Sequence, residues 1–344
     1  MARQLATVID INKCMGCQSC TIACKVAWTN YKGMDHMWWC KVNTMPGQGS
    51  PKDWEKMGGG YDKEVKLVLG KLPTLAEFGE AWEFNYEEVF YGGNPEAYLH
   101  PAKKPTWGPN WDEDIGDGEY PNAYLFYLPR RCNACSSPSC VEACPGRAEG
   151  VFVKREEDGI VVLDDEKCEA TKCQYECMRA CPYKVLYAHT SRPSVAHKCN
   201  FCLPRLERGV APCCVRQCPG RCVWIDYLDN EEGAIYKLVS EWKVALPLHP
   251  EFNTSPNVYY VPPLSPPRID KSGNFDMDQP RIPMDYLQSL FGAGVDHALD
   301  TLKAERARQR RGERSELMDI LIAHQWTELL GPFPKDPSEV GGQR

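Results

Sequence analysis

The pattern of apolar and polar positions is helical mainly in the last third of the chain. From residue 284 to about residue 330, apolar residues recur at intervals of three and four positions: Leu287, Leu290, Phe291, Leu317, Ile320 and Leu321. This interval brings apolar side chains to one face of an α-helix, so we expect helices there. Six of the twelve residues from Lys303 to Arg314 are basic. We interpret this run as a solvated helix face.

Elsewhere the pattern favours short extended segments. Residues 151–153 and 159–163 are rich in valine, and the turn-forming residues 157–159 link them. We therefore expect two short strands joined by a turn. Proline punctuates residues 242–250 and 256–263. We expect both of these segments to be extended and to lie against another surface, either of this chain or of a partner subunit.

Residues 40–125 show weak helical periodicity and are rich in tryptophan, glycine and proline. We predict an irregular insertion whose aromatic side chains pack into the core. Within it, Asp112–Gly118 resembles a calcium-binding loop, but Gly116 takes a position that needs aspartate or asparagine in an EF-hand. We therefore interpret this segment as a turn-rich loop.

Composition and charge exclude several classes of protein. The chain has 344 residues, of which 43 % are hydrophobic and 25 % are charged, as in ordinary globular proteins. Its formal net charge of −7 lacks the basic bias of a general nucleic-acid-binding protein. No apolar run approaches the roughly 18 residues that a membrane-spanning helix needs, and residues 1–5 lack an apolar signal segment. We expect no nucleic-acid partner and no direct membrane span.

Cysteine departs most from ordinary composition, with nineteen copies. Sixteen form four groups: group one is Cys14, Cys17, Cys20 and Cys24; group two is Cys132, Cys135, Cys140 and Cys144; group three is Cys168, Cys173, Cys177 and Cys181; group four is Cys199, Cys202, Cys214 and Cys218. Proline follows the last cysteine of groups two, three and four. We expect the remaining cysteines, Cys40, Cys213 and Cys222, to be buried small side chains rather than ligands.

The spacing within the groups favours iron–sulfur clusters over other uses of cysteine. Group one has the C-x2-C-x2-C-x3-C spacing of bacterial ferredoxins, with Lys25 where those proteins have proline. A zinc ribbon needs two C-x2-C pairs around one tetrahedral ion and no third or fourth cysteine at these intervals. Disulfide frameworks are typical of short secreted chains, whereas this chain is long and its cysteine count is odd.

In ferredoxins with two clusters, the last cysteine of each cysteine group binds the cluster that the other group holds. We use this rule to assign the cysteines of this chain to sites. Groups one and four would exchange their last cysteines, and so would groups two and three. The predicted four-iron sites are then Cys14, Cys17, Cys20 and Cys218; Cys24, Cys199, Cys202 and Cys214; and Cys132, Cys135, Cys140 and Cys181.

The fourth site takes Cys144, Cys168 and Cys177, with Cys173 as the alternative fourth ligand. Group three lacks the C-x2-C-x2-C spacing. A site with only three thiolates holds a three-iron cluster, because one corner of the cube has no ligand. We therefore predict three 4Fe-4S clusters and one 3Fe-4S cluster, with four 4Fe-4S clusters as the alternative.

These groupings predict an α+β fold that contains two ferredoxin-like modules with two clusters each. Residues 1–39 and 186–245 would form the first module, and residues 126–185 would form the second. The irregular insertion, residues 40–125, would join them. Residues 246–344 would form an extended and helical C-terminal part that packs on partner subunits.

The sequence shows no catalytic motif. No histidine lies in an H-E-x-x-H context, no G-x-G-x-x-G follows a predicted strand, and no P-loop is present. Clusters without catalytic residues indicate an electron-transfer protein that is not an enzyme by itself. Two alternatives stay open at this point: a stand-alone polyferredoxin, and an enzyme that uses a cluster as a Lewis acid or a radical source.

The order and spacing of the cysteine groups resemble the iron–sulfur (beta) subunit of the nitrate reductase, or type II DMSO reductase, branch of molybdenum enzymes. This branch includes nitrate, selenate, chlorate and perchlorate reductases, dimethyl sulfide dehydrogenase and ethylbenzene dehydrogenase. The matching stretches are Ile11–Cys20, Asn110–Asp114, Cys132–Cys135, Ala180–Lys184, Trp242–His249 and Pro256–Pro263.

The resemblance implies a complex with a molybdopterin-containing catalytic alpha subunit and a haem b gamma subunit. It also implies three 4Fe-4S clusters and one 3Fe-4S cluster in this subunit. The second position of the family's third group usually holds a non-cysteine residue, often an aromatic one, whereas this chain has Cys173 in a longer loop. The short length resembles the periplasmic members, which are exported together with the catalytic subunit. A cytoplasmic, membrane-associated complex is the alternative.

Overall fold

A four-stranded sheet forms the centre of the molecule in the computed structural model, which describes residues 3–79, 85–98, 100 and 116–340. The strand order is β8 (Val223–Tyr227), β1 (Leu5–Asp10), β10 (Val258–Val261) and β9 (Leu246–Pro247). Strand β1 runs antiparallel to β8 and parallel to β10. Every residue of β1 is buried, as expected for an inner strand whose two faces are both covered.

Alternating side chains divide the core between the two faces of this sheet. Leu5 and Ile9 of β1 belong to the core that contains the cysteine groups. Ala6 and Val8 of the same strand belong to a second core, together with Leu302 of a C-terminal helix. Because successive side chains of a strand point to opposite faces, the sheet separates the cysteine-rich part of the molecule from the C-terminal helices.

The C-terminal residues cover the chain's own sheet. Helices α10 (Met284–Phe291), α11 (Val295–Arg310) and α12 (Glu316–Ile322) confirm the helical pattern of this region. The six basic residues between Lys303 and Arg314 are all exposed, which confirms the solvated face. The sequence pattern placed these helices on partner subunits. In the structure α11 and α12 pack on the chain's own sheet, because their apolar faces fill its second core, and packing of this region on partner subunits stays a prediction.

Strands β9 and β10 come from the segments that were expected to be extended. The backbone of β10 completes the hydrogen bonding of β1 on the edge that β8 leaves open. The expected boundary at residue 246, between the first module and the C-terminal part, therefore runs through a single sheet. Hydrophobic pattern alone did not show this pairing, because parallel strands are joined by long connections.

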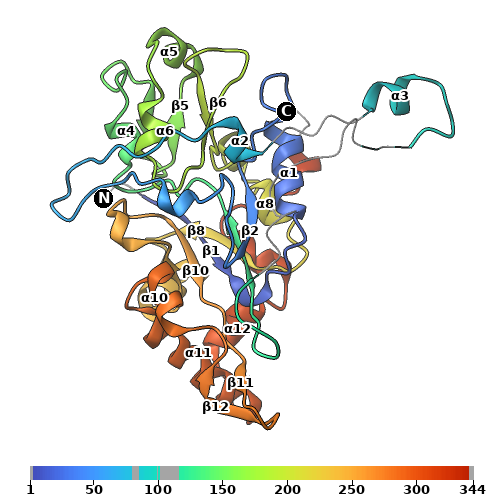
Figure 1. Cartoon of the computed structure of the whole chain (residues 1–344), viewed down its shortest axis with the longest axis vertical. Helices are drawn as coiled ribbons and strands as arrows, with labels where there is room; N and C mark the ends of the chain where they lie inside the picture. Colours follow the sequence, from blue (N-terminus) through green and yellow to red (C-terminus); the bar gives the residue numbers. More distant parts are fainter. Residues whose placement is uncertain (1–2, 80–84, 99, 101–115, 341–344) are drawn as a thin grey trace.

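The other strands of the described residues form four two-stranded antiparallel sheets. Strands β4 (Phe152–Lys154) and β5 (Val161–Leu163) are antiparallel and confirm the predicted pair, shifted by one or two residues. The other such sheets are β2 (Lys41–Met45) with β3 (Phe126–Arg130), β6 (Leu186–Ala188) with β7 (Ala196–Lys198), and β11 (Pro267–Ile269) with β12 (Phe275–Pro280). Figure 1 shows β11 and β12 at the end of the molecule opposite the α4–α6 region.

Most of the short helices begin at or beside a cysteine group. They are α1 (Ser19–Trp28), α4 (Ser139–Glu142), α5 (Asp165–Ala170), α6 (Glu176–Ala180), α7 (Leu203–Leu206) and α8 (Cys213–Arg216), and α9 (Ala234–Tyr236) follows β8. In the part of the chain that the structure describes, no helix is both long enough and apolar enough to cross a membrane.

The described residues of the insertion have little regular structure. It contains β2 and the short helices α2 (Leu75–Phe78) and α3 (Tyr86–Tyr91). Trp54 is wholly buried, with the Arg130 guanidinium carbon 3.4 Å from the centre of its ring. The matched stretch 110–114 lies outside the described residues, as do Trp82, Trp107 and Trp111 and most of the loop 112–118.

Candidate iron–sulfur sites

The first cavity joins group one to the last cysteine of group four. Its lining includes Cys14, Cys17, Cys20 and Cys218. The loop before α1 turns sharply, because Gly16 and Gln18 have φ angles of 68° and 58°. This left-handed backbone, which favours glycine, lets three cysteines of one short loop line the same space.

The second cavity joins the remaining cysteines of these two groups. Its lining includes Cys24, Cys199, Cys202 and Cys214. Helix α1 carries Cys24 and packs against α8, which carries Cys214. The cysteines that line each cavity are those that the ligand-exchange rule grouped, and their assignment as ligands stays a prediction.

Each cavity also contains a fifth cysteine. Cys40 lines the second cavity and Cys222 lines the first. Both side chains are buried, as expected, and the sulfur of Cys222 lies 3.3 Å from that of Cys218. Their thiols are therefore near enough to contact a cluster held by the predicted ligands.

Polar groups point to an acceptor-rich occupant of the second cavity. Arg131 is buried, and its Nη1 donates a hydrogen bond to the sulfur of Cys214 at 3.3 Å. Among the described residues, its Nη2 and the indole nitrogen of Trp39 have no hydrogen-bond partner. Both residues line this cavity. Since buried donors are almost always paired, the sulfides of an iron–sulfur cluster fit this site as acceptors.

The charge of Arg131 is stabilised by sulfur. Burial works against its charge, but the thiolates of Cys214, Cys40 and Cys199 outweigh burial and raise the pKa of Arg131 above its ordinary value. On the other side of the cavity, the indole nitrogen of Trp28 donates to the sulfur of Cys202 at 3.1 Å. The cavity therefore offers hydrogen-bond donors and a positive charge to an anionic group.

The third set of cysteines lies where α4 meets α6. The set is Cys132, Cys135, Cys140 and Cys181. Ser139, next to Cys140, donates a hydrogen bond from its Oγ to the carbonyl oxygen of Ala180, next to Cys181, at 2.9 Å. Burial raises the pKa of the Cys140 thiol, and the neighbouring thiolates of Cys181 and Cys132 raise it further. Four thiolates can be deprotonated together here only if cations offset their charge.

Two buried lysines lie near cysteines of this third set, Lys198 near Cys140 and Lys184 near Cys181. The Nζ of Lys198 donates to the carbonyl oxygens of Val161 and Cys199. The Nζ of Lys184 donates to the carbonyl oxygen of Arg179 at 2.9 Å, and burial lowers the pKa of Lys184 to about 8. Neither ammonium group forms an ion pair with a described carboxylate, so both are placed to offset the charge of a thiolate-bound cluster.

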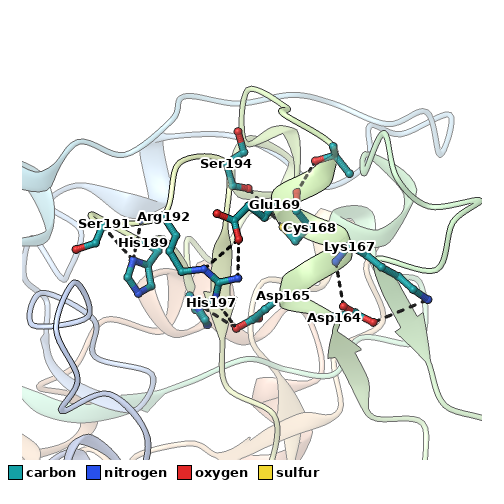
Figure 2. A network of polar contacts seen from close by, with 11 residues as sticks. Asp164, Asp165, Lys167, Cys168, Glu169, His189, Ser191, Arg192, Ser194 and His197 are labelled. Atoms are coloured by element: carbon teal, nitrogen blue, oxygen red, sulfur yellow. Dashed lines mark hydrogen bonds and ion pairs between the residues drawn. The ribbon is translucent and has the colours of Figure 1, made fainter.

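The fourth set contains all the remaining cysteines of groups two and three: Cys144, Cys168, Cys173 and Cys177. Cys168 lies on α5, Cys177 lies on α6, and Cys173 lies in the loop between these helices. Figure 2 shows the polar network beside Cys168, in which Arg192 pairs with Asp165 and Glu169 at 3.5 and 2.9 Å. Unlike Arg131, this guanidinium is neutralised by carboxylates.

The donor sets do not match a site for a single metal ion. Zn²⁺ binds four thiolates at about 2.3 Å, so that all four converge on one point. Within residues 3–79, 85–98, 100 and 116–340, no three cysteine, histidine or acidic side chains converge in this way. The cysteines of the first two sets instead line cavities.

Sequence reasoning missed some of the residues around these cavities. Nothing in the spacing marks Cys40 or Cys222 as part of these sites, because neither belongs to a group of four, although Cys222 follows Cys218 closely in the chain. The signal for Arg131 was present but weak: it directly precedes Cys132 yet lies beside Cys214 of another site. Cys213 lines an outer groove rather than either cavity.

Comparisons with known proteins agree with this chemistry. A family profile described as a 4Fe-4S dicluster domain matches residues 123–227. The beta subunit of dimethylsulfide dehydrogenase from Rhodovulum sulfidophilum is 49 % identical over 328 residues, which cover 95 % of this chain and 98 % of that protein. The beta subunit of selenate reductase from Thauera selenatis is 50 % identical over 325 residues, covering 94 % and 97 %. The beta subunit of chlorate reductase from Ideonella dechloratans is 50 % identical over 324 residues, covering 93 % and 96 %.

Proposed function

Because the chain belongs to the beta subunits of the type II DMSO reductase family of molybdenum enzymes, we propose that it relays electrons through four iron–sulfur clusters. The clusters would connect a molybdopterin-containing catalytic subunit to a haem b subunit or another external carrier. The beta subunit would carry no catalytic residues, and the substrate would react in the partner.

One observation carries the proposal: cysteines from both ends of the cysteine-bearing part of the chain line two adjoining cavities. Cys218 lies with Cys14, Cys17 and Cys20, while Cys24 lies with Cys199, Cys202 and Cys214. An exchange of this kind is typical of ferredoxins with two clusters. It supports clusters that are close to one another, as electron transfer requires.

The residues of this chain would hold the clusters and set their reduction potentials. The proposed ligand sets are the four described above, and each bound cluster would supply one-electron redox chemistry. Burial, hydrogen bonds to sulfur and nearby charge tune such potentials over roughly −700 to +450 mV. Arg131 and Trp28 would provide such hydrogen bonds at the second site.

The proposed partners follow from the relatives, whose names describe beta subunits of reductases and a dehydrogenase. We also propose that the chain is exported to the periplasm together with its catalytic subunit. Cell fractionation tests this location. Recovery of the complex on the cytoplasmic side of the membrane would favour the alternative compartment.

The function is tested by anaerobic purification of the tagged full-length chain from its native host. We expect a brown complex in which mass spectrometry identifies a larger molybdenum-binding subunit, with iron and acid-labile sulfide present and EPR signals appearing on reduction. A redox-active chain without partners would indicate a stand-alone polyferredoxin. A colourless protein, or one that contains zinc instead of iron, would contradict the proposal.

A further inference from the structure

We propose that Cys173 is the second ligand of the fourth site, so that Cys144, Cys168, Cys173 and Cys177 hold a 4Fe-4S cluster rather than a 3Fe-4S cluster. This inference rests on the proposed function, because it assumes that the cysteine groups bind iron–sulfur clusters. It replaces the three-iron prediction, which came from irregular spacing alone.

The backbone before Cys173 repeats a feature of the other three groups. In each of those groups, the residue directly before the second cysteine adopts a left-handed conformation: Gly16, Ala134 and Phe201, with φ angles of 68°, 43° and 56°. Lys172 directly precedes Cys173 and has a φ angle of 48°. This conformation is unfavourable for a residue other than glycine, so its recurrence before the second cysteine of all four groups indicates a common turn that presents the second ligand.

The spacing after Cys173 lies within the range of the other groups. Between the second and third cysteines there are two residues in group one, four in group two and eleven in group four, against three between Cys173 and Cys177. The number of residues between the second and third cysteines therefore varies among the four groups. The left-handed conformation of the residue before the second cysteine is present in all four. The interval between the second and third cysteines of group three is therefore no obstacle to a fourth corner, and group three differs from the others only in the four residues, rather than two, between its first and second cysteines.

Ser194 holds the two ends of the loop together. The thiol of Cys168 donates to the carbonyl oxygen of Ser194 at 3.4 Å, and the Oγ of Ser194 donates to the carbonyl oxygen of Cys173 at 3.5 Å. Figure 2 shows Ser194 next to Cys168 at the end of α5. Ser194 thus lies against both the first and the second cysteine of group three, and its hydrogen bond to the carbonyl oxygen of Cys173 does not depend on the protonation of Cys168.

Cys144 approaches the same loop from group two. Gly146, two residues after Cys144, packs so closely on Thr171 that an added Cβ would lie 2.5 Å from its methyl carbon. Thr171 stands two residues before Cys173. The absence of a side chain at Gly146 therefore lets the turn after Cys144 rest against the segment that leads into Cys173.

Tyr175 does not take the place of the fourth ligand. It adopts a left-handed conformation directly before α6, two residues ahead of Cys177, just as Gln18 does before α1, two residues ahead of Cys20. Its hydroxyl accepts a hydrogen bond from the backbone nitrogen of Ser194 at 2.9 Å. The aromatic residue therefore starts a helix, and the second-ligand position belongs to Cys173.

The test compares the wild-type complex with two variants, Cys173→Ala and Tyr175→Phe, all purified anaerobically. On binding, the Cys173 thiol would release its proton to solvent and form an iron–sulfur bond. We expect the oxidised wild-type complex to lack the EPR signal of a three-iron cluster. Cys173→Ala should lose one iron per chain and gain that signal, because one corner of the cube loses its ligand. Tyr175→Phe should match the wild type.

The wild-type spectrum decides the question even if Cys173→Ala does not assemble. A three-iron signal that persists in the wild type after anaerobic incubation with ferrous iron and reductant would overturn the inference. So would a Cys173→Ala variant with unchanged iron content and spectrum. Neither result would touch the proposed function, which fails only if the wild-type complex contains no iron–sulfur clusters at all.

Discussion

Several cationic side chains lie beside the cysteine sites without a carboxylate partner in the described part of the chain. Arg131 donates to the sulfur of Cys214, and Lys184 and Lys198 donate to backbone carbonyl oxygens around the third set. Burying an unpaired charge costs several kcal/mol. The cost is offset if a cluster and its thiolates, which together are anionic, occupy the neighbouring site. We therefore expect these cations to serve the cluster sites rather than the core in general.

Replacing Arg131 with glutamine should lower the midpoint potential of the second-site cluster. A buried positive charge stabilises the reduced, more negative cluster, and removing a charge beside a cluster is worth on the order of 100 mV in a protein interior. EPR-monitored redox titration of the complex measures the shift. Arg147→Gln is the control, because Arg147 forms an exposed ion pair with Glu142. An equal shift in both variants, or none in Arg131→Gln, would contradict the assignment.

His249 is a buried histidine held between two carboxylates, away from the proposed ligands. Its Nδ1 lies 2.7 Å from Glu251 Oε1, and its Nε2 lies 2.9 Å from Glu55 Oε1. Burial lowers the pKa of His249, but the hydrogen bonds to Glu251 and Glu55 outweigh burial and hold the pKa above its ordinary value of 6.5. The charged histidine therefore ties β9 and the turn after it to the insertion.

The linkage predicts the direction of a pH effect on stability. The pKa of His249 is higher in the folded state than in the unfolded state. Its interactions with Glu55 and Glu251 therefore contribute their full stabilisation below about pH 6.5, and this contribution is lost as the pH rises through the folded-state pKa of His249. Above pH 6.5 the thermal midpoint of the wild type should therefore fall more steeply with pH than that of His249→Gln. His297→Gln, at an exposed position of α11, should follow the wild type. Parallel curves for all three proteins would rule out this role.

At the scale of elements, short helices present the cysteines, and their first residues decide which way each sulfur points. Helix α8 begins with two adjacent cysteines. Cys214 lines the second cavity beside Arg131, whereas Cys213 lines an outer groove with Arg216. Neighbouring residues of a helix lie about 100° apart around its axis, so the two sulfurs cannot occupy one corner of a cluster.

Cys214→Ser should therefore remove the second-site cluster, while Cys213→Ser should leave the iron content of the complex intact. Iron and acid-labile sulfide per chain, together with EPR of the reduced complex, distinguish the two variants. We expect Cys214→Ser to lose about a quarter of this subunit's iron, because one cluster in four is missing. Equal loss in both variants would show that the register of α8 is different.

At the scale of the whole molecule, the central sheet brings the two ends of the cysteine-bearing region together. Strand β1 leads into group one, and β8, its antiparallel neighbour, follows group four. The first two cavities therefore lie at one end of a pair of strands. Their geometry depends on the sheet, which in turn is closed by β10 and covered by α11 and α12.

The exchange of ligands can be tested by double variants. If Cys24 serves the second site, Cys24→Ala and Cys202→Ala should each lose the same cluster, and the double variant should lose no more iron than either. Combining Cys24→Ala with Cys17→Ala should instead remove two clusters, since Cys17 serves the first site. Iron per chain in the purified complex gives the answer. If group one bound a cluster by itself, the double variant of Cys17 and Cys24 would lose only one cluster, and the double variant of Cys24 and Cys202 would lose two.

The sequence by itself determined the chemistry and the local elements. The spacing of the cysteines indicated iron–sulfur clusters, and the periodicity after residue 284 indicated helices, because both depend on residues close together in the chain. Only the tertiary structure decided what surrounds the sites. The approach of Arg131 and Cys40 to the second cavity, the place of β10 beside β1, and the cover of C-terminal helices all depend on contacts between distant segments. Packing, which no local pattern encodes, selects those contacts.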